Sequence, residues 1–150
     1  MTEATRRARA VAIEVAAVHA ASVDRDARFP RETIEALRAE RLLGARVPTE
    51  RGGEGLPLRD IASVCHELGQ RCASSAMIYA MHQIQVACIV RHAGDSAWHA
   101  AFMERLAGDQ LLLASATSEA GVGGDVRSSV CAVAREGEAI ALEKNATVIS

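Results

Sequence analysis

Hydroxyl side chains and glycines gather in one short stretch of the chain, LASATSEAGVGGDVRSSVCAVA, which spans residues 113–134. Ser115, Thr117 and Ser118 place three hydroxyls at the end of a strand-like run. The glycine-rich segment 121–124 follows; its bare backbone lets a ligand approach closely, and its successive N–H groups form a concavity that suits anions. A flat heteroaromatic ring with acceptors along its edge, together with a diphosphate, fits such a set of donors.

The spacing of these glycines excludes two common nucleotide-binding motifs. The segment lacks the G-x-G-x-x-G spacing of a dinucleotide fingerprint, no helical pattern follows it, and it has no Gly-Lys-Ser/Thr of a P-loop. On spacing alone, a plain glycine-rich connection between strands and a ligand-binding loop both stay open. Glu119 and Asp125 are equally well explained as turn formers, because Asp readily hydrogen-bonds its own loop backbone.

The elements that must position this stretch are helical before it and strand-like after it. Apolar residues recur at helical spacing through the first two-thirds of the chain and predict five helices. The first four lie near 11–22, 30–44, 58–72 and 73–90. The fifth runs from Asp95 or Ser96, either of which is a good N-cap, to Leu106. After Gly108 the period changes, and QLLLASATS, SSVCAVARE and AIALEKNATVIS read as strands separated by turns.

The order of these patterns predicts a mainly α fold with two domains. Residues 1–110 form a helical-bundle domain, and residues 111–150 form the first strands of a β-barrel-like domain. Two or three strands do not easily make an independently stable sheet, so we expect the β domain to be incomplete within this chain.

The segment 73–90 carries no charged residue. A helix that is apolar nearly all round is either buried or spans a membrane, and the polar residues His82, Gln83 and Gln85 argue against spanning. We therefore expect a central, fully buried helix whose polar groups find partners or face a cavity. Replacing Ile84 by Asp is then expected to be strongly destabilising.

Composition narrows the class of protein. The 150 residues carry a net charge of −2 with acids and bases interleaved, which is unlike a nucleic-acid binder or a polybasic membrane patch. The four cysteines form no C-x-x-C pair and no metal-ligand spacing, so we expect free core thiols, no metal site and a cytoplasmic location.

Three stretches, in order, resemble the acyl-CoA dehydrogenases, which are flavoproteins of three domains. FPRETIEALRAERLLGARVPTERGGEGLPLRD resembles their N-terminal helix, Val-Pro and Gly-Gly-x-Gly loop. HAGDSAWHAAFMERLAGDQLLLASATSEAGVGGD resembles the passage from the last N-terminal helix into the β domain, and TVIS resembles the next flavin-contacting strand.

This resemblance implies an FAD cofactor. The strand that lines the flavin ring in the family corresponds to Ser115, Thr117 and Ser118, and the loop and the last strand add Gly123, Gly124 and Ser150. The family's Thr-Glu-Pro-Gly-x-Gly-Ser-Asp corresponds to residues 118–125, with Ala120 in place of the proline and Gly124 in place of the serine.

The resemblance also implies the reaction, α,β-dehydrogenation of an acyl-CoA thioester. In the family a carboxylate beyond the N-terminal part removes the α-proton, so no residue here is assigned as catalytic, and we expect residues 1–150 alone to be inactive. Met81, His82 and Gln85 correspond to the helix beside the acyl pocket. An electron-transfer partner and a homo-oligomer are implied, with no nucleic acid and no membrane insertion.

Two alternatives stay open. Val148 stands where the family usually has a tryptophan packed on the flavin, which leaves a flavin-dependent monooxygenase of the same fold as the second interpretation. The third is a non-catalytic helical interaction module that keeps the scaffold without flavin. A catalytic carboxylate elsewhere in the protein distinguishes the first from the second, and bound flavin distinguishes both from the third.

Overall fold

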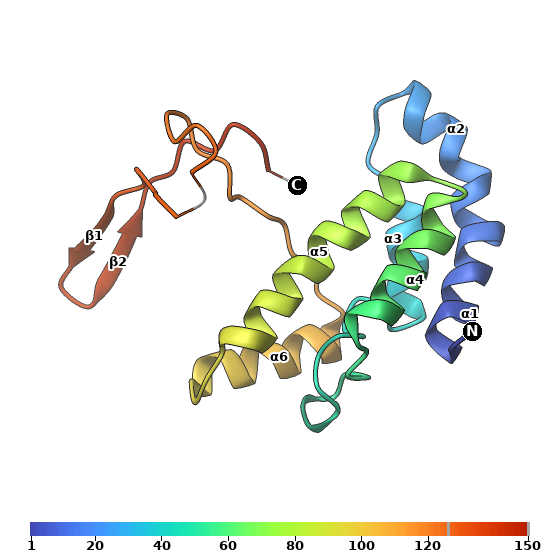
Figure 1. The fold of residues 1–150 in the computed structure, drawn as a ribbon, viewed down its shortest axis with the longest axis horizontal. Helices are drawn as coiled ribbons and strands as arrows, with labels where there is room; N and C mark the ends of the chain where they lie inside the picture. Colours follow the sequence, from blue (N-terminus) through green and yellow to red (C-terminus); the bar gives the residue numbers. More distant parts are fainter. Residues whose placement is uncertain (126, 150) are drawn as a thin grey trace. The chain divides into compact units, whose positions relative to one another are not determined.

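The computed structural model describes residues 1–125 and 127–149, and it divides into two compact units, Met1–Leu113 and Ala114–Ser150. Helices make up the first unit, and the second contains a small antiparallel sheet (Figure 1). The predicted fold class, a mainly α chain in which a helical domain precedes the strands, is therefore confirmed.

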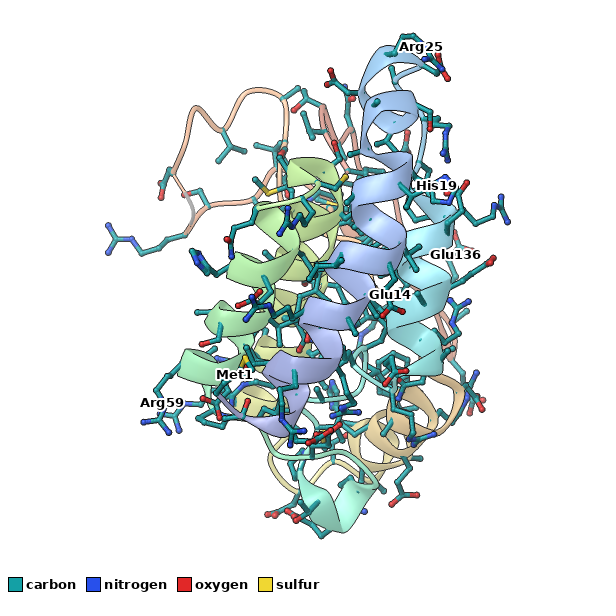
Figure 2. The ribbon with its side chains drawn as sticks, turned by 90° about the vertical axis from the view of Figure 1, so that its right-hand side faces the viewer. Met1, Glu14, His19, Arg25, Arg59 and Glu136 are labelled. Carbon is teal, nitrogen blue, oxygen red and sulfur yellow. The ribbon has the colours of Figure 1, made fainter. Side chains whose placement is uncertain are left out.

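Residues 1–113 are all described and contain six α-helices. The first two, α1 and α2, form one continuous helical stretch through a π-helical turn, η1, because every residue at the junctions keeps right-handed helical dihedrals. The bounds are α1 Glu3–Val11, η1 Ala12–Ala16, α2 Ala17–Arg25, α3 Arg31–Ala39, a 3-10 turn η2 Thr49–Arg51, α4 Leu58–Gly69, α5 Ala73–His92 and α6 Ala97–Asp109. Exposed charges such as Glu14 and Arg25 project from this first stretch (Figure 2).

Local chemistry explains where several helices begin and end. The Ser96 hydroxyl accepts a hydrogen bond from the His99 N–H at the start of α6, so of the two candidate N-caps Ser96 is the one that caps the helix. By contrast, α3 ends at Ala39, well before Gly44, where the pattern places its end. Arg41 adopts a φ of 56°, in the left-handed region, so the helix cannot continue through it.

The main core of the helical unit lies where α4 packs between α1 and α5 (Figure 1). Its larger fully or nearly fully buried members are Ile34, Leu37, Leu42, Leu43, Ile61, Val64, Leu68 and Tyr79. A second cluster forms around α6 from Val47, Val86, Met103, Leu106 and Ala107. Burial of these apolar side chains provides the main favourable free energy of folding in this unit.

The expectation that residues 73–90 form a helix buried all round is wrong. The segment lies in α5, but Met77 is 61% exposed and Ile84 is 51% exposed. One face of α5 packs against the rest of the unit, and the other face is open in this structure. Among the described residues α5 is also the one helix long and apolar enough to cross a membrane, by length and composition only.

The second unit has one antiparallel pair of strands, β1 Val133–Glu136 and β2 Ala139–Leu142. Gly137, with a φ of 65°, makes the turn that the sequence predicts between them. Residues 110–118 and 128–132, predicted as strand, form none. Of the last predicted strand, only β2 forms within the described residues 139–149. Within the described residues these segments have no neighbouring strand to complete a ladder.

Candidate functional site

Three of the six predicted cofactor-binding residues line one open cavity of the second unit. This cavity, of about 760 Å³, is lined by Thr117, Ser118 and Gly124 together with Ser128, Ser129 and Lys144 among others. Ser115 and Gly123 are not among its lining residues but are sequence neighbours of residues that are. Ser150 lies outside the described residues. The cavity wall therefore carries several hydroxyls, the Lys144 ammonium group and the carboxylates of Glu119 and Asp125.

The glycines of the loop are required by backbone conformation. Gly123 and Gly124 have φ values of 61° and 90°, in the left-handed region that residues with a side chain rarely adopt. A Cβ atom at either position would meet no atom within 4 Å, so crowding is not the reason for glycine there. The loop thus exposes bare backbone beside the cavity.

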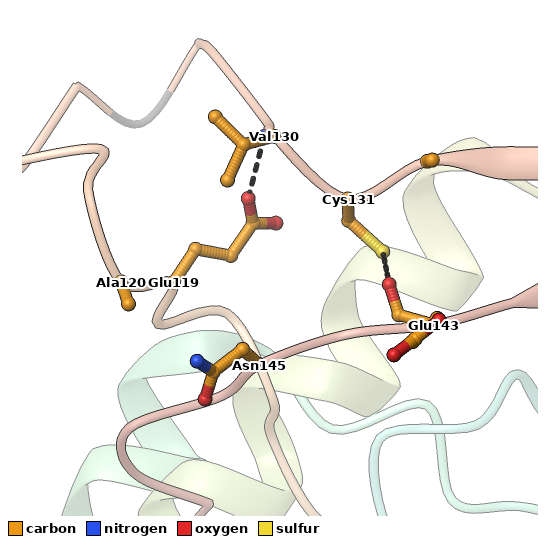
Figure 3. Close-up of a pocket in the computed structure, with 7 residues that line it drawn as sticks. Glu119, Ala120, Val130, Cys131, Glu143 and Asn145 are labelled. Carbon is orange, nitrogen blue, oxygen red and sulfur yellow. Dashed lines mark hydrogen bonds between the residues drawn. The ribbon is translucent and has the colours of Figure 1, made fainter.

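Glu119, at the start of this loop, is hydrogen-bonded to Val130, which follows the end of the loop (Figure 3). Its carboxylate accepts hydrogen bonds of 2.8 Å from the Ser129 hydroxyl, the Val130 N–H and the Lys144 ammonium group. The bond from Lys144, followed by those from Ser129 and Val130, lowers the pKa of Glu119 to about 2. Glu119 therefore joins the start of the loop, its end and the segment after β2 through one carboxylate.

Asp125 is a turn former, as one of the two sequence interpretations has it. Its carboxylate accepts a hydrogen bond of 2.7 Å from the Ser128 hydroxyl and one of 3.1 Å from the Arg127 N–H. The Ser128 bond, and then the Arg127 bond, lower the pKa of the Asp125 carboxyl. Both acids of the loop are thus engaged within the unit, and hydroxyls and N–H groups remain for a ligand.

Lys144 is the site residue that sequence reasoning missed. It is the only lysine of the sequence, and its ammonium group bonds Glu119 while it also lines the 760 Å³ cavity. A lysine has three N–H donors, so two are left for an anionic ligand after the bond to Glu119. The sequence feature that could have indicated Lys144 is the position of this single lysine directly after the predicted β hairpin, because the hairpin brings the chain back towards Glu119.

The three residues predicted to line an acyl pocket divide between two faces of α5. Met81 and Gln85 are half-buried and lie one turn apart on the same face of the helix. His82 is fully buried and bonds the Leu43 carbonyl and the Leu113 N–H through its two ring nitrogens. Burial lowers the pKa of His82, and in this conformation its ring presents no surface to a ligand.

Side chains of α5 hold an irregular segment that the sequence pattern did not reveal. The Tyr79 hydroxyl donates to the Leu42 carbonyl, and the Gln83 amide donates to the carbonyls of Leu42 and Leu43. Directly after α6, the Gln110 side chain accepts from the N–H groups of Leu43 and Gly44. Residues 42–44 leave helical geometry and are buried, so these side chains satisfy the backbone groups that the helix no longer pairs.

The sequence of the helical unit matches a known protein family. Residues 2–110 match the family described as "Acyl-CoA dehydrogenase, N-terminal domain". The chain belongs to the acyl-CoA dehydrogenase family. The resemblance inferred from the sequence is thereby confirmed, and the family is one of oxidoreductases.

Two relatives show what share of their length matches this chain. It is 35% identical over 126 residues to 3-sulfinopropanoyl-CoA desulfinase of Paraburkholderia xenovorans (strain LB400), covering 81% of this chain and 32% of the relative. It is 32% identical over 120 residues to the probable acyl-CoA dehydrogenase fadE25 of Mycobacterium leprae (strain TN), covering 80% of this chain and 31% of the relative. The chain thus spans about a third of the length of these relatives.

Proposed function

We propose that this chain is the N-terminal helical domain and the start of the flavin-binding β domain of an FAD-dependent acyl-CoA dehydrogenase. The reaction is α,β-dehydrogenation of an acyl-CoA thioester. The observation that carries the proposal is the hydroxyl-rich cavity formed by Thr117, Ser118, Gly124 and Lys144, directly after a helical unit that matches this family.

The donor set of the cavity fits the polar parts of FAD. The hydroxyls of Thr117 and Ser118 suit the acceptors along the edge of the isoalloxazine ring. The bare backbone at Gly124 and the two remaining N–H donors of Lys144 suit the diphosphate. These residues would hold the cofactor and, by donating to the ring, favour the negative charge that the ring gains when it is reduced.

FAD would supply the hydride acceptor for the β-hydrogen of the substrate, and the chain supplies binding and orientation. A general base must be free to take a proton, and Glu119 and Asp125 are not suited to that role. Each already accepts hydrogen bonds from at least two donors, and each has a lowered pKa. The proposal therefore assigns cofactor binding to residues 115–124 and proton abstraction to no described residue.

The relative from Paraburkholderia supports a second candidate function. Its name describes removal of a sulfinate group from an acyl-CoA, and it shares 35% of the aligned residues with this chain. Both candidates act on an acyl-CoA thioester, and they differ in the group that leaves C3. An assay with a saturated acyl-CoA and an artificial electron acceptor, beside one with 3-sulfinopropanoyl-CoA that follows release of the sulfur, distinguishes them.

Two matched glycine variants test the cofactor site in the protein that contains these residues. Gly124 and Gly121 share a φ of 90°, and neither position has an atom within 4 Å of an added Cβ, but only Gly124 lines the cavity. We expect Gly124→Val to raise the dissociation constant for FAD about tenfold, equivalent to ~1.4 kcal/mol, and Gly121→Val to leave it nearly unchanged. Equal changes of the FAD dissociation constant in the two variants would mean that the loop connects strands and does not bind the cofactor.

A further inference from the structure

His82 occupies an unusual place among the buried side chains of the helical unit. It lies midway along α5, is fully buried, and uses both ring nitrogens in hydrogen bonds. Nε2 lies 2.8 Å from the Leu43 carbonyl oxygen, and Nδ1 lies 3.1 Å from the Leu113 nitrogen. The ring therefore links the irregular segment 42–44 to the point where the chain leaves the helical unit.

The chemistry of the two partners fixes the form of the imidazole. A carbonyl oxygen only accepts and a backbone N–H only donates, so Nε2 carries the proton and Nδ1 is bare. The ring is thus neutral and of one tautomer, in agreement with its burial.

Leu113 is held by its side chain, which packs partly buried against the cluster around α6, and by one backbone hydrogen bond. Of residues 112–119, all of them described, only Leu113 donates a backbone N–H to a hydrogen bond, and that bond goes to His82. The last backbone bond before it runs from Leu111 to Leu106 at the end of α6, and the next along the chain is donated by Ala120. The segment that follows Leu113 carries Ser115, Thr117 and Ser118.

We propose that His82 is a positioning residue, whose Nδ1 fixes the chain at Leu113 and thereby sets where the hydroxyl-bearing segment 115–118 begins. Its effect on flavin binding rests on the proposed function, whereas its hold on Leu113 does not. This role differs from contact with an acyl group, because the buried ring acts only through the backbone that it holds.

Two substitutions separate the bonds that His82 makes. His82→Asn places a side-chain oxygen close to the position of Nδ1, so it can still accept from Leu113 but does not reach Leu43. His82→Gln places an amide nitrogen close to the position of Nε2, so it can still donate to Leu43 but offers Leu113 no acceptor at the Nδ1 position. Asn is one methylene smaller than Gln, so at this fully buried position a role in packing alone would make His82→Asn the more perturbed variant, the opposite of the order that loss of the Leu113 bond predicts.

The experiment measures amide hydrogen exchange at Leu113 and the dissociation constant for FAD in the protein that contains these residues. We expect His82→Gln to speed exchange at Leu113 and weaken FAD binding by about fivefold relative to His82→Asn, the factor that one ordinary hydrogen bond provides. Equal exchange rates at Leu113 in the two variants overturn the proposal. So does a fivefold difference in exchange with equal FAD affinities. If the wild-type protein binds no FAD, the proposed function fails while the exchange data still decide whether His82 holds Leu113.

Discussion

The glycine loop between η2 and α4 offers a sharp test of the structure. An added Cβ on Gly53 would lie 2.0 Å from the carbonyl oxygen of Val47 and 2.6 Å from its carbonyl carbon. Both are backbone atoms of a fully buried residue, so no side chain can rotate away to make room. Gly53→Ala must therefore move the backbone of one segment or the other.

The size of the effect follows from what that movement breaks. The Val47 carbonyl accepts the N–H of Gly55 at 2.8 Å, and the neighbouring Ala45 carbonyl accepts the N–H of Leu56 at 2.9 Å. Overpacking of a well-packed site costs ~1–3 kcal/mol, and a lost hydrogen bond costs ~0.5–1.5 kcal/mol. We expect Gly53→Ala to lower the free energy of unfolding by ~2–4 kcal/mol.

Urea unfolding followed by circular dichroism measures this loss, with Gly108→Ala as the matched control. Gly108 lies in α6, and an added Cβ there meets no atom within 4 Å. Because alanine favours the helix over glycine by about 0.5–1 kcal/mol, this control should be neutral or stabilising. A Gly53→Ala protein as stable as the wild type would refute the packing of this loop against Val47.

Two further predictions concern α5. Because Ile84 is 51% exposed, Ile84→Asp should change the free energy of unfolding by less than ~1 kcal/mol. Val86 is fully buried, so Val86→Asp should lower it by ~3 kcal/mol or more. Similar urea midpoints for the two variants would contradict the assignment of Ile84 to the exposed face of α5 and of Val86 to the buried face. Stability should also fall as the pH drops below the ordinary histidine pKa of 6.5, because burial lowers the pKa of His82 and the unfolded chain then binds the proton first. Urea midpoints near neutral and mildly acidic pH should show a smaller decrease for His82→Asn than for the wild type.

Much of the fold could be predicted because it depends on local patterns. Helical spacing of apolar residues located the main helices, and Ser96 marked the start of α6 by a hydroxyl cap that acts within one turn. The end of α3 was misplaced because Leu42 and Leu43 continue the apolar pattern after the backbone has left the helix. Only side chains distant in sequence, such as Tyr79 and Gln110, stabilise that departure.

The exposed face of α5 shows a different limit. The absence of charged residues from a helix indicates that its surface is apolar, but it does not indicate which neighbouring element, if any, covers that surface. Ile84 and Met77 are as apolar as core residues, yet they are exposed in this structure.

Within the candidate site, the glycines and hydroxyls were predictable because their chemistry is visible residue by residue. The contact of Lys144 with Glu119 was not, since it joins residues on either side of the hairpin.

The most direct test of the proposed function follows the visible absorbance of FAD in the protein that contains these residues. The protein is reconstituted with FAD, freed of oxygen and mixed with a saturated acyl-CoA, with isolated residues 1–150 as the control. We predict that the flavin absorbance bleaches in the protein and stays unchanged in the control. A protein that binds FAD but is not bleached by any acyl-CoA would contradict the dehydrogenase function, and one that binds no FAD would contradict the cofactor site as well.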